Sequence, residues 1–213
     1  MKVAAVIGLE FPVELLQRIY NKSMDGHIRS HILVEEIQQA CSAEFIHQDP
    51  RNARVYLFNN VHFQQVAYSR LLFSQRTRLH REIAKHFEAF VNSKNDCIDV
   101  GVLYPALHHH WDAILSASIA DKHIDQEALS KTILYLKLIG EYSSQLGDEG
   151  AISYFSNALE KTKLISEKEE RIKRQKELKL KIIGTARNIS TTRSLILPKS
   201  PQTVKSGPPQ SHS

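Results

Sequence analysis

The apolar residues near the start of the chain recur with the spacing of short amphipathic helices. Leu15, Leu16, Ile19 and Tyr20 share one helical face, which predicts a helix over residues 11–20 with Pro12 in its first turn. After the turn-forming pair at 25–26, a second helix is predicted over residues 28–40. Its apolar face comprises Ile28, Ile32, Leu33 and Ile37.

Two short apolar runs then predict a β-hairpin. Residues 44–47 and 54–58 flank a segment with Asp, Pro and Asn, which are turn formers. Further helices are predicted at about 60–72 and 75–91, the latter with an apolar face of Leu79, Ile83, Ala84, Phe87 and Phe90. Two helices beside a two-stranded ribbon indicate a winged-helix-like domain over residues 1–91.

After a polar break at 92–96 the pattern becomes helical throughout, at roughly 100–118, 125–146 and 149–165. Large residues on one helix and small-large-small residues on the next follow the tetratricopeptide spacing: Tyr135, Leu138 and Tyr142, then Ala151, Phe155 and Ala158. Ile139 and Lys163 depart from the motif, which prefers Gly and Pro there. We therefore expect tetratricopeptide-like helices over 92–165, with a generic helical hairpin as the alternative. The partner-binding candidates are Tyr135, Leu138, Tyr142 and Phe155.

The last part of the chain changes composition twice. Residues 166–183 are rich in the helix formers Glu, Lys, Arg and Leu and predict a charged helix. From residue 184 Ser, Thr, Pro and Gly dominate and acidic residues vanish, which predicts a disordered tail over 184–213. The expected fold class is mainly α: a winged-helix domain with a short hairpin, tetratricopeptide-like hairpins and this tail.

The net charge of +5 suggests an acidic partner until it is divided along the chain. Residues 1–160 carry 15 Lys and Arg against 19 Asp and Glu, whereas residues 161–213 carry 13 against 4. The predicted second helix has one Arg and two Glu, so we do not expect it to read DNA. Nucleic-acid association through the basic end remains an alternative, and it would be steeply salt-dependent.

Hydropathy and cysteine usage place the protein in the cytoplasm. No apolar run reaches the roughly 18 residues of a membrane span, and no signal-peptide pattern precedes the first one. The isolated Cys41 and Cys97 form neither a disulfide framework nor a metal pair, which favours a reducing compartment.

The remaining polar motifs carry no recognisable catalytic, cofactor or metal site. The eight glycines form no phosphate-binding loop. His108, His109 and His110 are adjacent, so on a helix they point about 100° apart and do not converge on one ion. His80 and His86, six residues apart, do not share a face, and His80 is expected to be half-buried packing. We therefore predict no enzyme activity and no cofactor.

Three segments resemble the signal-transducing STAND-type ATPases, and among them the soluble, bicarbonate-responsive (type 10) adenylyl cyclases. They are residues 4–11 (AAVIGLEF), 56–68 from Tyr-Leu-Phe to Val-Ala-Tyr, and 78–84 (RLHREIA). The resemblance implies a P-loop ATPase module followed by a winged helix and tetratricopeptide-like helices. It also implies that the cyclase domains and the P-loop would precede residue 1. Where many relatives have a nucleotide-facing His, this chain has Asn60, with His62 two positions later.

These observations predict a non-catalytic regulatory or interaction fragment, linked to cyclic AMP signalling by resemblance alone. Its expected partners are another protein, or ATPase and cyclase modules in a longer form. The alternative is an independent scaffold whose face around Tyr135 and Tyr142 holds a partner peptide.

Overall fold

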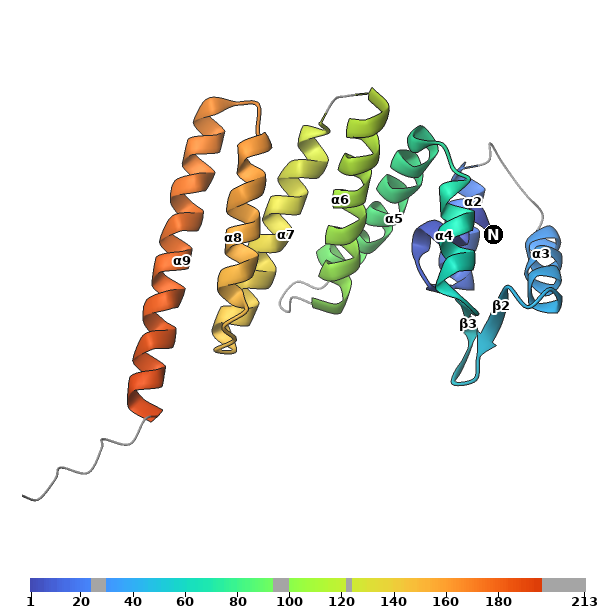
Figure 1. Ribbon diagram of the computed structural model, residues 1–213, viewed down its shortest axis with the longest axis horizontal. Helices are drawn as coiled ribbons and strands as arrows, with labels where there is room; N and C mark the ends of the chain where they lie inside the picture. The colour runs from blue at the N-terminus through green and yellow to red at the C-terminus, as the bar shows by residue number, and fades with distance from the viewer. Residues whose placement is uncertain (24–29, 94–99, 122–123, 197–213) are drawn as a thin grey trace, which may run out of the picture.

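The computed structural model describes residues 1–23, 30–93, 100–121 and 124–196. It is mainly helical and contains a small three-stranded antiparallel sheet (Figure 1). The predicted turn at 25–26, Ile28, most of the polar break, Cys97 and residues 197–213 lie outside the described residues. The elements are α1 (Lys2–Ile7), β1 (Glu10–Pro12), α2 (Val13–Ser23), α3 (Ser30–Ser42), β2 (Ile46–Asp49), β3 (Asn52–Phe58), α4 (Val61–Ser69), α5 (Phe73–Ser93), α6 (Val100–Asp121), α7 (Gln126–Gln145), α8 (Ala151–Lys161), the 3₁₀ turn η1 (Thr162–Leu164) and α9 (Lys168–Ile196).

The predicted hairpin is confirmed, and a third strand joins it. β2 and β3 pair antiparallel, and β1 pairs with the other edge of β3, giving the order β1-β3-β2. The prediction that Phe11 and Pro12 begin a helix was therefore wrong. Phe11 is fully buried against Tyr56 and Phe58 of β3. Pro12, which has no N–H to donate, ends an edge strand, where that loss is tolerated.

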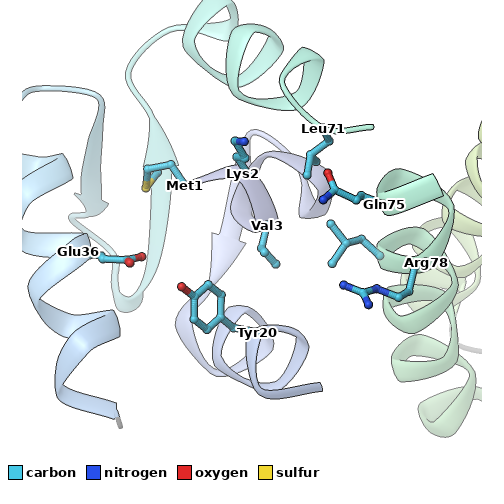
Figure 2. A pocket seen from close by; sticks show the side chains of 9 residues that line it. Met1, Lys2, Val3, Tyr20, Glu36, Leu71, Gln75 and Arg78 are labelled. Carbon is cyan, nitrogen blue, oxygen red and sulfur yellow. The ribbon is translucent and has the colours of Figure 1, made fainter. Parts of the chain in front are cut away.

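Helix α1 lies at the centre of the N-terminal half. Ala4 and Ala5 are almost fully buried in one cluster with Phe11, Leu16 and Phe58, while Val6 joins a second cluster with residues of α2 and α5. Their small side chains let α4 approach, and Gln64 donates its side-chain N–H to the Ala5 carbonyl at 2.6 Å. A cavity of about 350 Å³ opens between α1, α2, α3 and α5 (Figure 2).

Helix α3 uses a narrower apolar face than the sequence predicts. Leu33 and Ile37 are buried in the N-terminal core. Ile32 is 39% exposed, so it does not belong to the packed face. The helices predicted at 60–72 and 75–91 are confirmed as α4 and α5. Because α5 continues to Ser93, it crosses the predicted domain boundary at 91/92, which itself stays a prediction.

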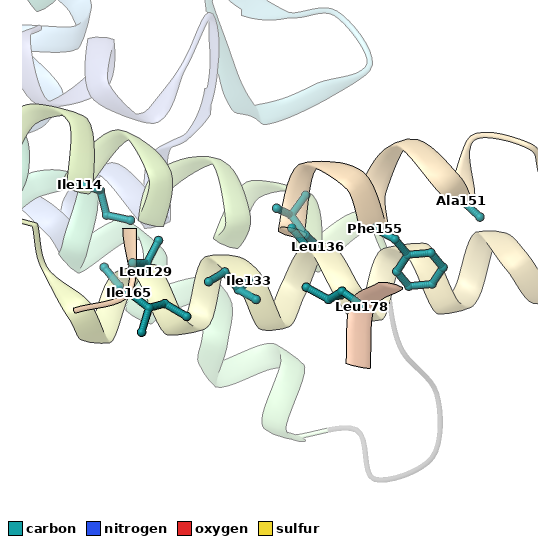
Figure 3. Close-up of a cluster of buried hydrophobic side chains, with 10 residues drawn as sticks. Ile114, Leu129, Ile133, Leu136, Ala151, Phe155, Ile165 and Leu178 are labelled. Carbon is teal, nitrogen blue, oxygen red and sulfur yellow. The ribbon is translucent and has the colours of Figure 1, made fainter. Parts of the chain in front are cut away.

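The C-terminal half is a row of helices, α6 to α9, in which each helix lies beside the next (Figure 1). Figure 3 shows the apolar cluster that joins them, with side chains from α6, α7, α8, the turn after η1 and α9. Its members are Ile114, Ala128, Leu129, Ile133, Leu136, Ala151, Phe155, Ala158, Ile165 and Leu178.

A glycine sets the distance between α7 and α8. A Cβ atom at Gly140 would lie 2.8 Å from the ring of Phe155, closer than packed atoms approach. Ala151 and Ala158, at 0% exposure, flank Phe155 on α8. The tetratricopeptide pattern prefers a small residue at position 139, which here is the buried Ile139, and the close approach to Phe155 occurs at the adjacent Gly140.

The prediction of disorder from residue 184 was wrong for residues 184–196, which continue α9 without a break. Thr185 is buried, and its hydroxyl lies 3.3 Å from that of Ser144 on α7. Leu178, about two turns earlier, is 1% exposed in the apolar cluster. The packing against α7 and α8 therefore stabilises a segment that composition alone would leave unfolded.

Candidate functional site

Buried polar side chains gather where α5 meets α6 and α7, and they are the strongest candidate for a functional site. Helix α5 contributes His80 and Glu88, and α6 contributes the adjacent histidines. His108 is exposed and lies 3.2 Å from Asp112. His109 and His110 are buried and contact different partners on α5, so the three rings diverge as the 100° helical step requires.

His80 and His109 form a buried pair. Their Nδ1 atoms are 2.9 Å apart, and Nε2 of His80 lies 3.0 Å from the Tyr68 hydroxyl of α4. His80 is 2% exposed, so the expectation of a half-buried residue was wrong. One ring must present an unprotonated Nδ1 that accepts the other ring's N–H. If both Nδ1 atoms were protonated, two N–H donors would face each other with no acceptor between them.

Burial keeps both rings of this pair neutral. It lowers the pKa of His80 to about 3, with the nearby His108 and Arg76 adding to the effect. It lowers the pKa of His109 to about 2, with further contributions from the neighbouring histidines. Asp112, which lies 4.0 Å from Nδ1 of His80, has a pKa raised by burial and opposed by His108.

Glu88 is the centre of a second network. Its carboxylate accepts hydrogen bonds from the Tyr135 hydroxyl at 2.9 Å, Nζ of Lys131 at 3.1 Å and Nε2 of His110 at 2.8 Å. Burial opposes the charge, but these three donors hold the pKa of Glu88 below its usual range. Burial and the carboxylate together raise the pKa of Tyr135. The network thus joins α5, α6 and α7 through one carboxylate.

The other ring nitrogen of His110 has a different environment. Within the part of the chain that the structure describes, His110 Nδ1 is buried and has no hydrogen-bond partner. Burial lowers the pKa of His110, and Glu88 partly restores it. The ring is therefore best read as neutral, with its proton on Nε2 and directed at Glu88.

The start of α7 is tied to α5 by a third contact. Asp125 is the N-cap of α7 and accepts from the backbone N–H groups of Glu127 and Ala128, each at 3.1 Å. The same carboxylate lies 2.7 Å from the Arg81 guanidinium of α5. These contacts outweigh burial and lower the pKa of Asp125.

The cavity in Figure 2 brings together Tyr20, Glu36 and Arg78 from three helices. Burial raises the pKa of Tyr20, and its interaction with the Glu36 carboxylate raises it further. A phenol that stays protonated beside a carboxylate is a hydrogen-bond donor, not a base. The apolar part of the lining comes from Val3, Leu71 and Leu79.

The structure separates the four predicted partner-binding residues. Tyr135 and Phe155 are buried, at 6% and 1% exposure, so they cannot form an exposed partner face. Leu138 is half-buried against the cluster of Leu103, Ala106, Tyr135 and Ile139. Tyr142 is 37% exposed and remains accessible.

Two central residues, Glu88 and Lys131, were missed in the sequence. Glu88 lies four residues after Ala84 on the apolar side of α5, and a charge at such a position signals a buried partner.

Two further residues singled out in the sequence have structural roles or low reactivity. Burial raises the pKa of the Cys41 thiol, which disfavours its reactive thiolate. Asn60 caps α4 and accepts from the backbone N–H of His62 at 2.8 Å.

Comparison of the chain with protein-family models, curated proteins and solved structures finds no match. In the described ranges, no three or more His, Cys, Asp or Glu side chains are grouped so that they could hold a metal ion. The helices described here include none with the length and apolarity needed to cross a membrane.

Proposed function

We propose that this chain is a non-catalytic regulatory or interaction module, in which a winged-helix-like unit is rigidly coupled to a tetratricopeptide-like array. It would correspond to the region after the ATPase module in proteins similar to soluble adenylyl cyclases. The link to cyclic AMP signalling rests on that resemblance. A rigid coupler needs one element that belongs to both halves, and α5 has this property.

The contacts of α5 are the observation that carries the proposal. Leu79 and Ile83 pack with Val6, Leu15 and Ile19 in the N-terminal half. Phe87 packs against this cluster and also against the cluster of α6 and α7, and its ring stacks on that of His109. The networks at His80 and Glu88 add directional hydrogen bonds to the same joint, so a displacement of one half would be transmitted to the other.

Two local arrangements support the finer assignment. The order helix, strand, two helices and hairpin, with the first strand on the edge of the sheet, is consistent with a winged helix. The close approach of Gly140 to Phe155, flanked by buried alanines, is consistent with a tetratricopeptide-like hairpin.

The non-catalytic part of the proposal is tested by assaying the purified chain for ATP hydrolysis and for cyclic AMP formation from ATP. We expect turnover equal to that of a heat-denatured sample of the same preparation. Turnover above that control, which falls in proportion when the chain is diluted, would overturn the proposal.

A scaffold that holds a partner peptide is the second candidate. A groove of about 330 Å³ between α7 and α9 has the partly exposed Leu134 and the buried Leu178 in its lining, with Lys137 and Glu177 paired across it at 2.6 Å. A protein captured through this groove should still bind after residues 197–213 are removed. Binding that is lost on removal or in high salt would instead be driven by tail charge.

A further inference from the structure

Helix α9 has an open side opposite the one that packs. Leu178 and Thr185 face α7 and α8 and are buried. Ile172, Leu180 and Ile183 are 41%, 71% and 48% exposed, and their spacing of eight and three residues places them on one helical face. With Lys176 and Lys179, which lie between them, they form what we call the α9 stripe.

The stripe is basic as well as apolar. Glu170 and Glu177, both on α9, pair with Arg174 and Lys137 on the side toward α7. Lys181 pairs with Glu141 of α7. Lys176 and Lys179, by contrast, form no ion pair with another described residue. Of the three acidic residues of α9, Glu170 and Glu177 are paired toward α7, and Glu169 is exposed about one turn before Ile172.

The last turns of α9 also extend beyond the helices that support it. Thr185 is level with Ser144, and α7 ends one residue later at Gln145. Helix α9 continues to Ile196, about 15 Å further at 1.5 Å per residue. Figure 1 shows this end of α9 projecting past α7 and α8. Helices in proteins are stabilised chiefly by the packing of an amphipathic face. The last turns of α9 extend past the end of α7, so α7 does not provide such packing for them.

We propose that the α9 stripe is a docking surface for an acidic amphipathic helix of a partner. Apolar side chains of that helix would cover Leu180 and Ile183, and flanking carboxylates would pair with Lys176 and Lys179. Docking of this kind combines the burial of the apolar face of an amphipathic helix with charge complementarity at its edges. It goes beyond the coupling role proposed above and does not depend on it.

An anionic membrane fits the stripe less well. Helices that lie in a membrane interface place a broad apolar face with aromatic residues in the lipid. Residues 168–196 contain no aromatic residue, and Lys176 interrupts the apolar side chains in the middle of the stripe. Nucleic acid would use the lysines but leave Leu180 exposed. A partner helix satisfies both kinds of side chain.

The test uses the full chain and a fluorescein-labelled 21-residue peptide, with leucines at helical spacing and glutamates on both flanks. Its control is a scrambled peptide of the same composition. Fluorescence anisotropy should show saturable binding of the patterned peptide, with Kd raised at least tenfold by Leu180→Asp and by Lys176→Glu. Because both side chains are on the open face, circular dichroism should show unchanged helix content.

Two matched variants control for non-specific apolar and charge effects. Leu146→Asp changes a side chain of similar exposure (68%) at the end of α7, and Arg51→Glu reverses a 94% exposed charge in the hairpin. Both should leave Kd within twofold of the unmodified chain. Equal loss in the controls, equal binding of the scrambled peptide, or no binding at 100 µM peptide would overturn the proposal. Tighter binding to phosphatidylserine-containing vesicles than to the peptide would also overturn it.

Discussion

Glu88 shows how one residue can determine a joint between three helices. Its backbone belongs to the apolar side of α5, and its carboxylate accepts hydrogen bonds from donors on α6 and α7. Removal of such a group leaves several partners without an acceptor in a partly buried site. The cost therefore exceeds that of one lost surface ion pair.

Replacing Glu88 by Ala should lower the free energy of unfolding by about 2 kcal/mol or more, because Tyr135 and His110 would keep buried donors without an acceptor. The matched control is Glu14→Ala, since Glu14 forms an exposed pair with Arg54 at 3.6 Å and should change stability by less than about 1 kcal/mol. Urea unfolding followed by far-UV circular dichroism measures both. Equal effects of the two substitutions would show that the Glu88 network contributes no more than a surface pair.

The close packing of α7 on α8 depends on the absence of a side chain at Gly140. Gly140→Ala should destabilise the protein by about 1–3 kcal/mol, because the new Cβ would overlap the Phe155 ring unless the helices separate. Gly184→Ala is the control, since nothing lies within 4 Å of a Cβ there. In a helix interior it should stabilise by up to about 1 kcal/mol. Thermal unfolding that shows both substitutions shifting the midpoint in the same direction would contradict this packing account.

The joint between α5 and α6 should make stability depend on pH. His80 is faced by Tyr68 from α4, Arg76 from its own helix, and His108, His109 and Asp112 from α6. Since its folded pKa and that of His109 lie below the ordinary value of 6.5, the unfolded chain binds more protons below pH 6.5. Stability is therefore fully present above about pH 6.5 and declines toward pH 3.

The expected slope is about 1.4 kcal/mol per pH unit for each histidine that titrates only in the unfolded chain. Urea midpoints measured from pH 7.5 to 5 should fall, and His109→Gln should flatten the fall by removing one such group. A midpoint constant over this range, or an unchanged slope in the variant, would show that the pair is not held neutral by the fold.

The local pattern of apolar residues predicted the helices and strands better than it predicted which of them pair or pack together. The period of apolar residues located the hairpin, α4, α5 and the α7–α8 pair. It placed Phe11 in a helix because strand β1 is too short to show alternation and pairs with residues 55–57, more than forty positions away. Composition suggested disorder after residue 184, whereas the packing of Leu178 and Thr185 supports the helix there.

The candidate site could be predicted only in part, for a similar reason. The helical step explains why three adjacent histidines diverge, and this follows from sequence alone. Which side chain each ring meets depends on how α5 lies against α6, so the His80–His109 and His110–Glu88 pairs are tertiary facts. Tyr135 was expected on a partner surface because its large ring matched a motif, but its hydroxyl is directed at Glu88.

At the scale of the whole molecule, we propose that two halves are coupled through α5. Phe87 contacts the apolar clusters on both sides, and hydrogen bonds at His80 and Glu88 join α5 to α6 and α7. If this joint is stable, a loss of stability in the N-terminal core must also destabilise the C-terminal helices. The single Trp residue, Trp111, packs against the C-terminal cluster, and Nζ of Lys161 lies 3.4 Å from the centroid of its ring. Its fluorescence therefore reports on that half.

The most direct measurement is the urea unfolding of Phe11→Leu followed by Trp111 fluorescence. Phe11 lies in the N-terminal core, and its replacement should cost about 1–2 kcal/mol through lost packing. Coupling through α5 predicts that the Trp111 midpoint falls together with the midpoint seen by circular dichroism. A Trp111 midpoint that stays at its original urea concentration, while circular dichroism shows earlier loss of structure, would contradict the central claim.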